Sequence, residues 1–331
     1  MRFLIKLLFL VFLTLAAALG GLWWWAGQPL ALQNAPVDFH VANGSSLRAA
    51  LTEMRAAGIA VEPSLMLLLA RLSGAETGIK AGSYSVDDGV TPRQLLDKLV
   101  RGKVTQGDIT LVEGWTVRQW RARLAVNPDL NGDSRSLSEE EIARRLGLSY
   151  ASLEGWLFPD TYLFDKHSSD LDLIARAARA MERRLVAAWA GRDEGLPYRS
   201  PYEALIMASI IEKETGREAD REQIAAVFVN RLRLGMPLQT DPTVIYGLGE
   251  TFDGNLRKRD LLADTPYNTY TRRGLPPTPI AMPGLASIEA ALHPAPSQAL
   301  YFVARGDGSS HFSSTLDEHN RAVNRYQRSG K

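Results

Sequence analysis

The stretch that decides the fold is Tyr202–Thr215, YEALIMASIIEKET, whose apolar side chains recur at helical spacing. At about 100° per residue, its Ile and Met side chains share one face of the predicted helix. Glu214 falls near the middle of that face, whereas Glu212 falls almost opposite it. Burying an unpaired carboxylate is costly unless the group keeps its proton, and a general acid must hold a proton. The pattern therefore makes Glu214 a candidate catalytic acid.

The same spacing has a second interpretation, in which Glu214 simply marks the end of the helix. Gly216 is a plausible residue to cap the helix C-terminus, and Glu214 could then reach solvent where the helix stops. The spacing alone favours this interpretation, because catalytic carboxylates are rare among all Glu residues.

The composition excludes several classes of function. The 331 residues include 38 Lys and Arg against 37 Asp and Glu, so no basic field is available for a nucleic-acid partner. There are 0 Cys, which excludes disulfides, a thiolate nucleophile and Cys-ligated zinc. The His residues lack metal-binding spacing, and no serine elbow, phosphate loop or dinucleotide fingerprint is present. We therefore expect no metal and no cofactor, which leaves carboxylate chemistry.

The N-terminal run Leu7–Trp25 is uncharged and long enough to cross the hydrocarbon core of a bilayer. Arg2 and Lys6 precede the run, so the positive-inside rule places the N-terminus in the cytoplasm and the rest outside. Three Trp residues at 23–25 are expected at the outer interface. A cleaved signal peptide is the alternative, with residues 16–18 imitating a cleavage site, but the apolar run continues beyond them.

The next segment predicts a small α+β module that could bind glycan or serve as a spacer. Its expected order is strand, helix, helix, strand, followed by one more helix that begins after Thr91-Pro92. The expected elements are Val37–Val41, Leu47–Ala57, Leu65–Leu72, Lys80–Val86 and Arg93–Val100.

The C-terminal half gathers polar and aromatic residues around the predicted helix. A second helix is expected over Ile224–Leu234, followed by a tight polar turn over Gln239–Gly247 and a rigid loop over Pro266–Gly284. Such loops suit either a groove for a polar polymer or the wrapping of a core. The aromatic segment Glu154–Tyr162 suits either sugar stacking or a core corner, and the core is favoured.

The ordered motifs of the chain closely resemble those of the YceG-like endolytic murein transglycosylases, the MltG family. The resemblance covers essentially the whole chain after the apolar run. It is carried by VEGWT (Val112–Thr116), GWLFPDTY (Gly155–Tyr162), ASIIEKET (Ala208–Thr215), VFVNRLRLGMPLQTDPTVIYG (Val227–Gly247), YNTYTRRGLPP (Tyr267–Pro277) and LYFVARGDG (Leu300–Gly308).

The resemblance implies an α+β chain in four parts. These are a cytoplasmic tail (1–6), a transmembrane helix (7–25), a LysM-like α+β module (26–105) and a mixed α+β, lysozyme-like transglycosylase domain (106–331). The catalytic residue of the family is the second glutamate of EKET, which is Glu214 here and agrees with the helical spacing. The candidate glycan contacts are Gln239, Thr240, Asp241, Tyr267, Asn268 and Tyr270.

The implied activity is that of a lyase, which cleaves the MurNAc–GlcNAc bond within nascent strands, leaves 1,6-anhydroMurNAc ends and ends strand elongation. A lysozyme-like hydrolase is one alternative. It would need a second carboxylate, about 5–5.5 Å away for retention or about 6.5–9.5 Å away for inversion, and Asp241 and Asp264 are the candidates. A membrane-anchored glycan-binding scaffold without activity is another alternative, which leaves a buried Glu214 unexplained.

The resemblance also implies a location and partners. The chain is expected to cross the inner membrane once and to hold its catalytic domain in the periplasm. Peptidoglycan strands are the expected substrate, and peptidoglycan synthases are candidate protein partners.

Overall fold

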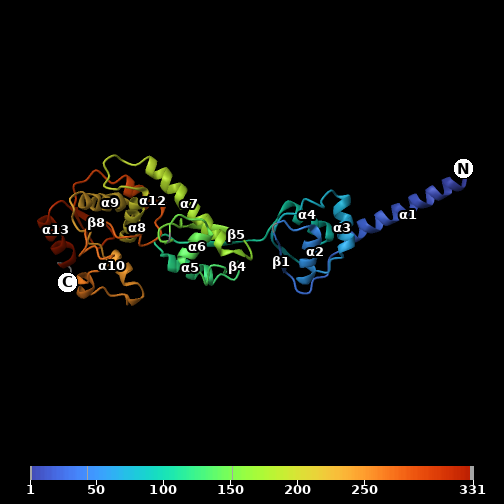
Figure 1. The fold of residues 1–331 in the computed structure, drawn as a ribbon, viewed down its shortest axis with the longest axis horizontal. Helices are drawn as coiled ribbons and strands as arrows, with labels where there is room; N and C mark the ends of the chain where they lie inside the picture. Colours follow the sequence, from blue (N-terminus) through green and yellow to red (C-terminus); the bar gives the residue numbers. More distant parts are fainter. Residues whose placement is uncertain (1, 43, 151, 329–331) are drawn as a thin grey trace. The chain divides into compact units, whose positions relative to one another are not determined.

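The computed structural model describes residues 2–42, 44–150 and 152–328 and divides the chain into two compact units (Figure 1). Unit 1 comprises Met1–Ile109, Pro128–Asn131 and Leu163–Ser169. Unit 2 comprises Thr110–Asn127, Gly132–Tyr162 and Asp170–Lys331. Helices predominate, and the strands of the described residues form small two-stranded sheets. The α+β class expected from the sequence is confirmed.

Helix α1 (Arg2–Ala26) is long and apolar enough to span a membrane, and it contains the predicted run. Met1 of the predicted tail lies outside the described residues. The most apolar part of α1 makes no buried contact, but its last turn enters the core of unit 1, where Ala26 is buried. Trp23 and Trp24 are exposed. Trp25 instead packs against the module, which the sequence did not predict.

The module in unit 1 has the predicted order of elements. Strands β1 and β2 pair antiparallel, with Val37 opposite Val86, and alternate residues of β1 face the core. Thr91 caps α4 through its side chain, and Pro92 takes the first helical position. The elements are β1 (Val37–Val41), α2 (Leu47–Ala56), α3 (Pro63–Leu72), β2 (Gly82–Val86) and α4 (Pro92–Arg101).

Two further short sheets join segments that are distant in sequence. Strand β3 (Gln106–Leu111) pairs with β5 (Asp160–Asp165), and β4 (Leu130–Asn131) pairs in parallel with β6 (Ser168–Ser169). The division expected at 105/106 falls just before the first passage at 109/110. Residues 128–131 and 163–169, which the sequence assigned to the catalytic domain, belong to unit 1.

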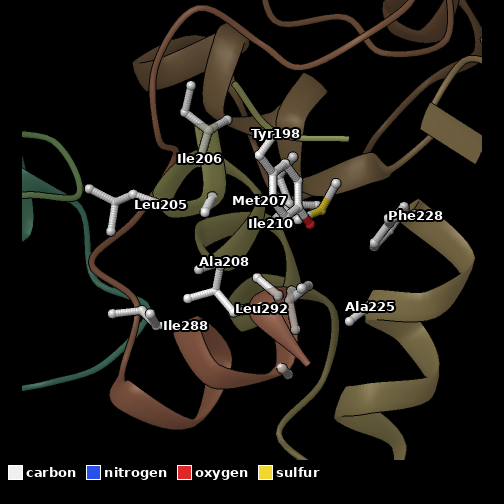
Figure 2. Packing of buried hydrophobic residues seen from close by; sticks show 14 of the residues in the cluster. Tyr198, Leu205, Ile206, Met207, Ala208, Ile210, Ala225, Phe228, Ile288 and Leu292 are labelled. Atoms are coloured by element: carbon white, nitrogen blue, oxygen red, sulfur yellow. The ribbon is translucent and has the colours of Figure 1, made fainter. Parts of the chain in front are cut away.

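Unit 2 is built around helix α8 (Pro201–Glu214), which contacts helices on several sides. The expectation of a single apolar face was wrong, because every residue from Ala204 to Ile211 is buried. Figure 2 shows the side chains of α8 packed among those of neighbouring helices, including Phe228 and Leu292. The remaining helices are α5 (Val117–Ala125), α6 (Glu139–Arg145), α7 (Asp170–Ala190), α9 (Glu218–Arg233), α10 (Asp241–Leu248), η1 (Gly249–Thr251), α11 (Lys258–Leu262), α12 (Leu285–Leu292), α13 (Leu316–Val323) and η2 (Asn324–Arg328).

Two further segments of unit 2 can be compared with the structure predicted for them from the sequence. The predicted polar turn over Gln239–Gly247 is instead mostly helix α10, which begins at Asp241 with Pro242 in its first turn. In the aromatic segment, Trp156 stacks between Tyr150 and Tyr202, with ring centroids 4.2 and 5.6 Å away. That segment therefore packs at a corner of the hydrophobic core, which is the interpretation that the sequence favoured. The C-terminal strands β7 (Tyr301–Ala304) and β8 (Ser310–Ser313) pair antiparallel.

We expect Ile210→Ala to lower the free energy of unfolding of unit 2 by roughly 2–5 kcal/mol, because the lost side chain leaves a cavity at a fully buried position of α8. Denaturant titration of the detergent-solubilised chain, followed by tryptophan fluorescence, measures the change. Val186→Ala at an exposed site of α7 is the control and should change stability by no more than about 0.5 kcal/mol. Equal effects of the two substitutions would contradict a central position for α8.

Candidate active site

Glu214 is the last residue of α8. The helix stops because Thr215 adopts an extended backbone, with φ −146° and ψ 133°, and its Oγ1 accepts a hydrogen bond from the Arg217 N–H at 2.9 Å. Gly216 does not take the left-handed conformation expected of a capping glycine. The helix therefore ends where the second interpretation placed its end, but by a different cap.

The Glu214 carboxyl group does not simply point into solvent. The Thr240 hydroxyl donates a hydrogen bond to Glu214 Oε1, and the side chain is only partly exposed. Burial raises the pKa of Glu214 above its ordinary range, and the nearby Asp241 carboxylate raises that pKa further. The Thr240 hydrogen bond favours the charged form and lowers the pKa, but burial is the larger effect. The site thus favours a protonated Glu214 that solvent can still reach.

Glu212, the first glutamate of EKET, has a structural role. Its Oε2 accepts hydrogen bonds from the Gly284 N–H at 3.0 Å and from the Ser287 hydroxyl at 2.7 Å. These contacts lie at the start of α12, where unpaired backbone N–H groups need acceptors. Glu212 and Glu214 therefore differ in their hydrogen-bond partners, and not in lying on a polar or an apolar face of α8.

The segment that carries Thr240 is fixed from two directions. Buried Arg231 donates hydrogen bonds to the carbonyls of Pro237 and Leu238 and to Gln239 Oε1, all at 3.0–3.2 Å. Gln239 has a φ of 53°, a strained conformation for a residue with a Cβ. The Thr240 N–H donates to Thr269 Oγ1 at 3.1 Å. These bonds hold the Thr240 hydroxyl in place against Glu214.

Asp241 and Tyr270 form a pair beside Glu214. The Tyr270 hydroxyl donates to Asp241 Oδ1 at 2.6 Å. Burial raises the pKa of Tyr270, and the hydrogen bond to Asp241 and the charge of Asp241 raise it further, which keeps the hydroxyl protonated as a donor. Gln239 and Asp241 are exposed, and Tyr270 is partly exposed. These three predicted contacts therefore reach the surface around Glu214.

The other predicted contacts hold the loop together. The Tyr267 hydroxyl hydrogen-bonds Thr278 Oγ1 at 2.8 Å, and its partly exposed ring packs edge-on against Tyr246. Asn268 is fully buried, donates to three backbone carbonyls and accepts from the Tyr270 N–H. Thr240 is also buried and meets Glu214. Direct contact of these residues with glycan stays a prediction.

The second-carboxylate candidates differ in their surroundings. Asp264 is exposed and paired with Arg272 at 2.7 Å, and that pair lowers the pKa of Asp264. Asp241 is the one whose charge acts on Glu214. Within residues 2–42, 44–150 and 152–328, no three His, Asp or Glu side chains gather as a metal site would require.

Sequence reasoning missed Glu154, a buried carboxyl group in unit 2. It is 4% exposed and accepts hydrogen bonds from the Val117 N–H at 3.2 Å and the Tyr246 hydroxyl at 3.0 Å. Burial raises the pKa of Glu154 from an ordinary 4.5 to about 8, although both hydrogen bonds oppose the shift. Its place at the start of the aromatic segment Glu154–Tyr162 was the signal that could have singled it out.

Comparisons with known proteins agree with the motifs. The model of the YceG-like family matches residues 39–325. An "Endolytic murein transglycosylase" of Bacillus subtilis is 34% identical over 88% of this chain and 84% of its own length. A protein of the same name from Streptococcus pneumoniae is 28% identical over 95% of this chain, which spans 64% of that relative. A crystal structure of a yceG-like protein from Listeria monocytogenes, 31% identical, has a TM-score of 0.56 and covers 86% of this chain and 98% of its own.

We expect the raised pKa of Glu154 to make unfolding dependent on pH. The folded state favours the proton, so the stabilisation is fully present below about pH 4.5 and is lost as pH rises through about 8. The free energy of unfolding should therefore fall between pH 5 and pH 8. Glu154→Gln, which does not titrate, should reduce that fall by roughly 2–4 kcal/mol in denaturant titrations at the two pH values.

Glu203→Gln on the first turn of α8 is the control, because Glu203 is a glutamate of the same unit that is only partly buried. An identical pH dependence in wild type and Glu154→Gln would contradict a protonated Glu154.

Proposed function

The chain belongs to the YceG-like family, and we propose that it is an endolytic murein transglycosylase in which Glu214 acts as general acid and base. The observation that carries this proposal is the partly exposed Glu214 carboxyl group, whose pKa is raised by burial and by Asp241. Relatives with this activity in their names match most of the chain. The reaction class is that of a lyase.

The proposed reaction uses one carboxyl group twice. Protonated Glu214 donates its proton to the glycosidic oxygen between MurNAc and GlcNAc as the bond from that oxygen to C1 breaks. Positive charge develops at C1 and the ring oxygen, as in an oxocarbenium ion. The Glu214 carboxylate then takes the proton from the C6 hydroxyl of the same MurNAc, and that oxygen bonds to C1. A 1,6-anhydro end forms, Glu214 regains its proton, and no water is consumed.

Asp241 and Thr240 set the proton affinity of Glu214 from opposite directions. The negative charge of Asp241 favours the protonated acid before cleavage, and it can stabilise positive charge at C1 during cleavage. The Thr240 hydroxyl favours the carboxylate that the second half of the reaction needs. Because one neighbour raises the pKa of Glu214 and the other lowers it, the carboxyl group is suited to give up a proton and then regain it.

The substrate surface is proposed to be the polar rim around Glu214. Gln239, Asp241, Tyr267 and Tyr270 reach that rim, and their hydroxyl, amide and carboxylate groups match the hydrogen-bonding groups of a glycan. Arg231 holds Gln239 from behind through a side-chain hydrogen bond. Thr240 and Asn268 would then act mainly by shaping the rim, because both are buried.

The proposed function includes a membrane arrangement for the whole chain. Helix α1 would cross the inner membrane once, with residues 1–6 in the cytoplasm and both folded units in the periplasm. Residues 26–105 would act as a LysM-like module and residues 106–331 as the catalytic domain. A short tether to the membrane favours nascent strands, whose synthases are the proposed partners.

A muramidase is the second candidate, because Asp241 places a second carboxylate near Glu214. A hydrolase would consume water and leave reducing ends. A scaffold without activity would bind strands and leave them uncut. The products therefore separate the three functions.

We expect Glu214→Gln to lower strand cleavage by at least about 100-fold and to keep the fold, because the amide cannot donate and recover the proton. Purified full-length protein and defined nascent strands, followed by mass spectrometry, measure the loss and identify anhydro ends. Glu212→Gln is the matched control from the same motif. Its amide oxygen can still accept from Gly284 and Ser287, so activity should stay within a few-fold of wild type. Cleavage by Glu214→Gln at the wild-type rate would overturn the assignment.

We expect two neighbouring substitutions to move the pH dependence of cleavage in opposite directions. Thr240→Val removes a hydrogen bond that lowers the pKa of Glu214, so the loss of activity on the alkaline side should shift to higher pH. Asp241→Asn removes a charge that raises this pKa, so the alkaline loss should shift to lower pH. Profiles of kcat/KM against pH report these shifts. Shifts in the same direction would contradict Glu214 as the titrating acid.

A further inference from the structure

A basic cleft of about 670 Å³ lies where the membrane-spanning helix α1 ends and unit 1 begins. We propose that this cleft binds the phosphate headgroup of an anionic phospholipid in the leaflet where α1 ends. The inference rests on α1 lying in a membrane and is independent of the chemistry at Glu214. Figure 1 shows α1 leading directly into the module, and α1 contacts both α3 and α4.

The cleft is lined by an excess of positive charge. Arg93, Lys98, Arg101 and Lys103 line it together with a single carboxylate, Asp97, which leaves a net charge of +3. Lys98 donates to the Ser85 carbonyl, and Arg101 pairs with Asp97 at 2.6 Å. Arg93 and Lys103 have no carboxylate partner among the ion pairs of the described residues.

The position of the cleft matches the level of lipid headgroups. Ala26 and Gly27, at the end of α1, form one wall, and the Leu30 N–H donates to the Val90 carbonyl at 2.8 Å to fix the next residues against α4. The Arg93 guanidinium lies 4.9 Å from the ring centroid of Trp23. Trp23 is exposed, and exposed Trp side chains at the end of a spanning helix prefer the headgroup region. The basic groups therefore lie beside the ring that would mark this region.

The charge and the position of the cleft favour binding of a lipid phosphate over nonspecific attraction to the membrane surface. A basic side chain near an anionic membrane surface strengthens binding roughly fivefold, and salt screens this attraction. A cleft next to the spanning helix also lets the acyl chains stay in the bilayer along the exposed apolar side chains of α1. An isolated soluble anion would gain only the charge contacts.

Native mass spectrometry of the detergent-solubilised full chain tests the proposal. Phosphatidylglycerol and phosphatidylcholine with identical acyl chains would be titrated separately, and the bound lipids counted. The wild-type chain should bind phosphatidylglycerol roughly tenfold more tightly than phosphatidylcholine. The triple variant Arg93→Gln, Arg101→Gln, Lys103→Gln should lose this preference and keep its weaker affinity for phosphatidylcholine.

A charge-matched control separates this site from general electrostatics. Arg48→Gln, Arg55→Gln, Arg71→Gln removes three exposed cations of α2 and α3 and should keep the lipid preference. Equal loss of preference in both triple variants, or no preference in the wild type, would overturn the proposal. So would full displacement of the lipid by an equal concentration of inorganic phosphate, which would indicate a site for free anions. Carbonate extraction should show that all three proteins remain inserted in membranes.

Discussion

The hydrogen bond between Thr240 and Glu214 is the interaction on which the rest of unit 2 depends. It joins the end of α8 to the segment before α10, and it places a hydroxyl against a carboxyl group whose pKa is raised by burial. The extended backbone of Thr215 stops the helix at the required residue. Local backbone geometry therefore sets the chemistry of the site.

The surrounding structure keeps both partners of this bond in place. Helix α8 is buried on every side, so the position of its last residue is fixed by close packing. The other partner is held by Arg231 and by Thr269, which together stabilise a segment with an unfavourable φ at Gln239. Glu212 ties α8 to the start of α12. Two glutamates of one motif thus differ in their contacts, since Glu212 joins α8 to α12 and Glu214 meets Thr240.

The sequence predicted local elements better than long-range contacts. Strand β1 has the predicted bounds, and the Thr91-Pro92 signal correctly marked the start of α4, because both patterns depend on neighbouring residues. The Asp241-Pro242 pair carries a similar helix-start signal, but its polar surroundings were interpreted as a turn. The wheel of α8 also misled, since a helix enclosed on all sides has no polar face from which to judge a carboxylate. The contact between Glu154 and Tyr246 could not be predicted, because the two residues are remote in sequence.

Comparison of Glu154 with Glu214 shows why a raised pKa does not by itself identify a catalytic acid. Burial raises the pKa of both carboxyl groups. Glu154 is almost inaccessible and accepts from a backbone N–H and a tyrosine hydroxyl, so its proton has no route to a substrate. Glu214 keeps part of its surface open and has a single hydroxyl donor from Thr240. Access is therefore the second requirement, and it is met because α8 ends at the residue where its buried surroundings open to solvent.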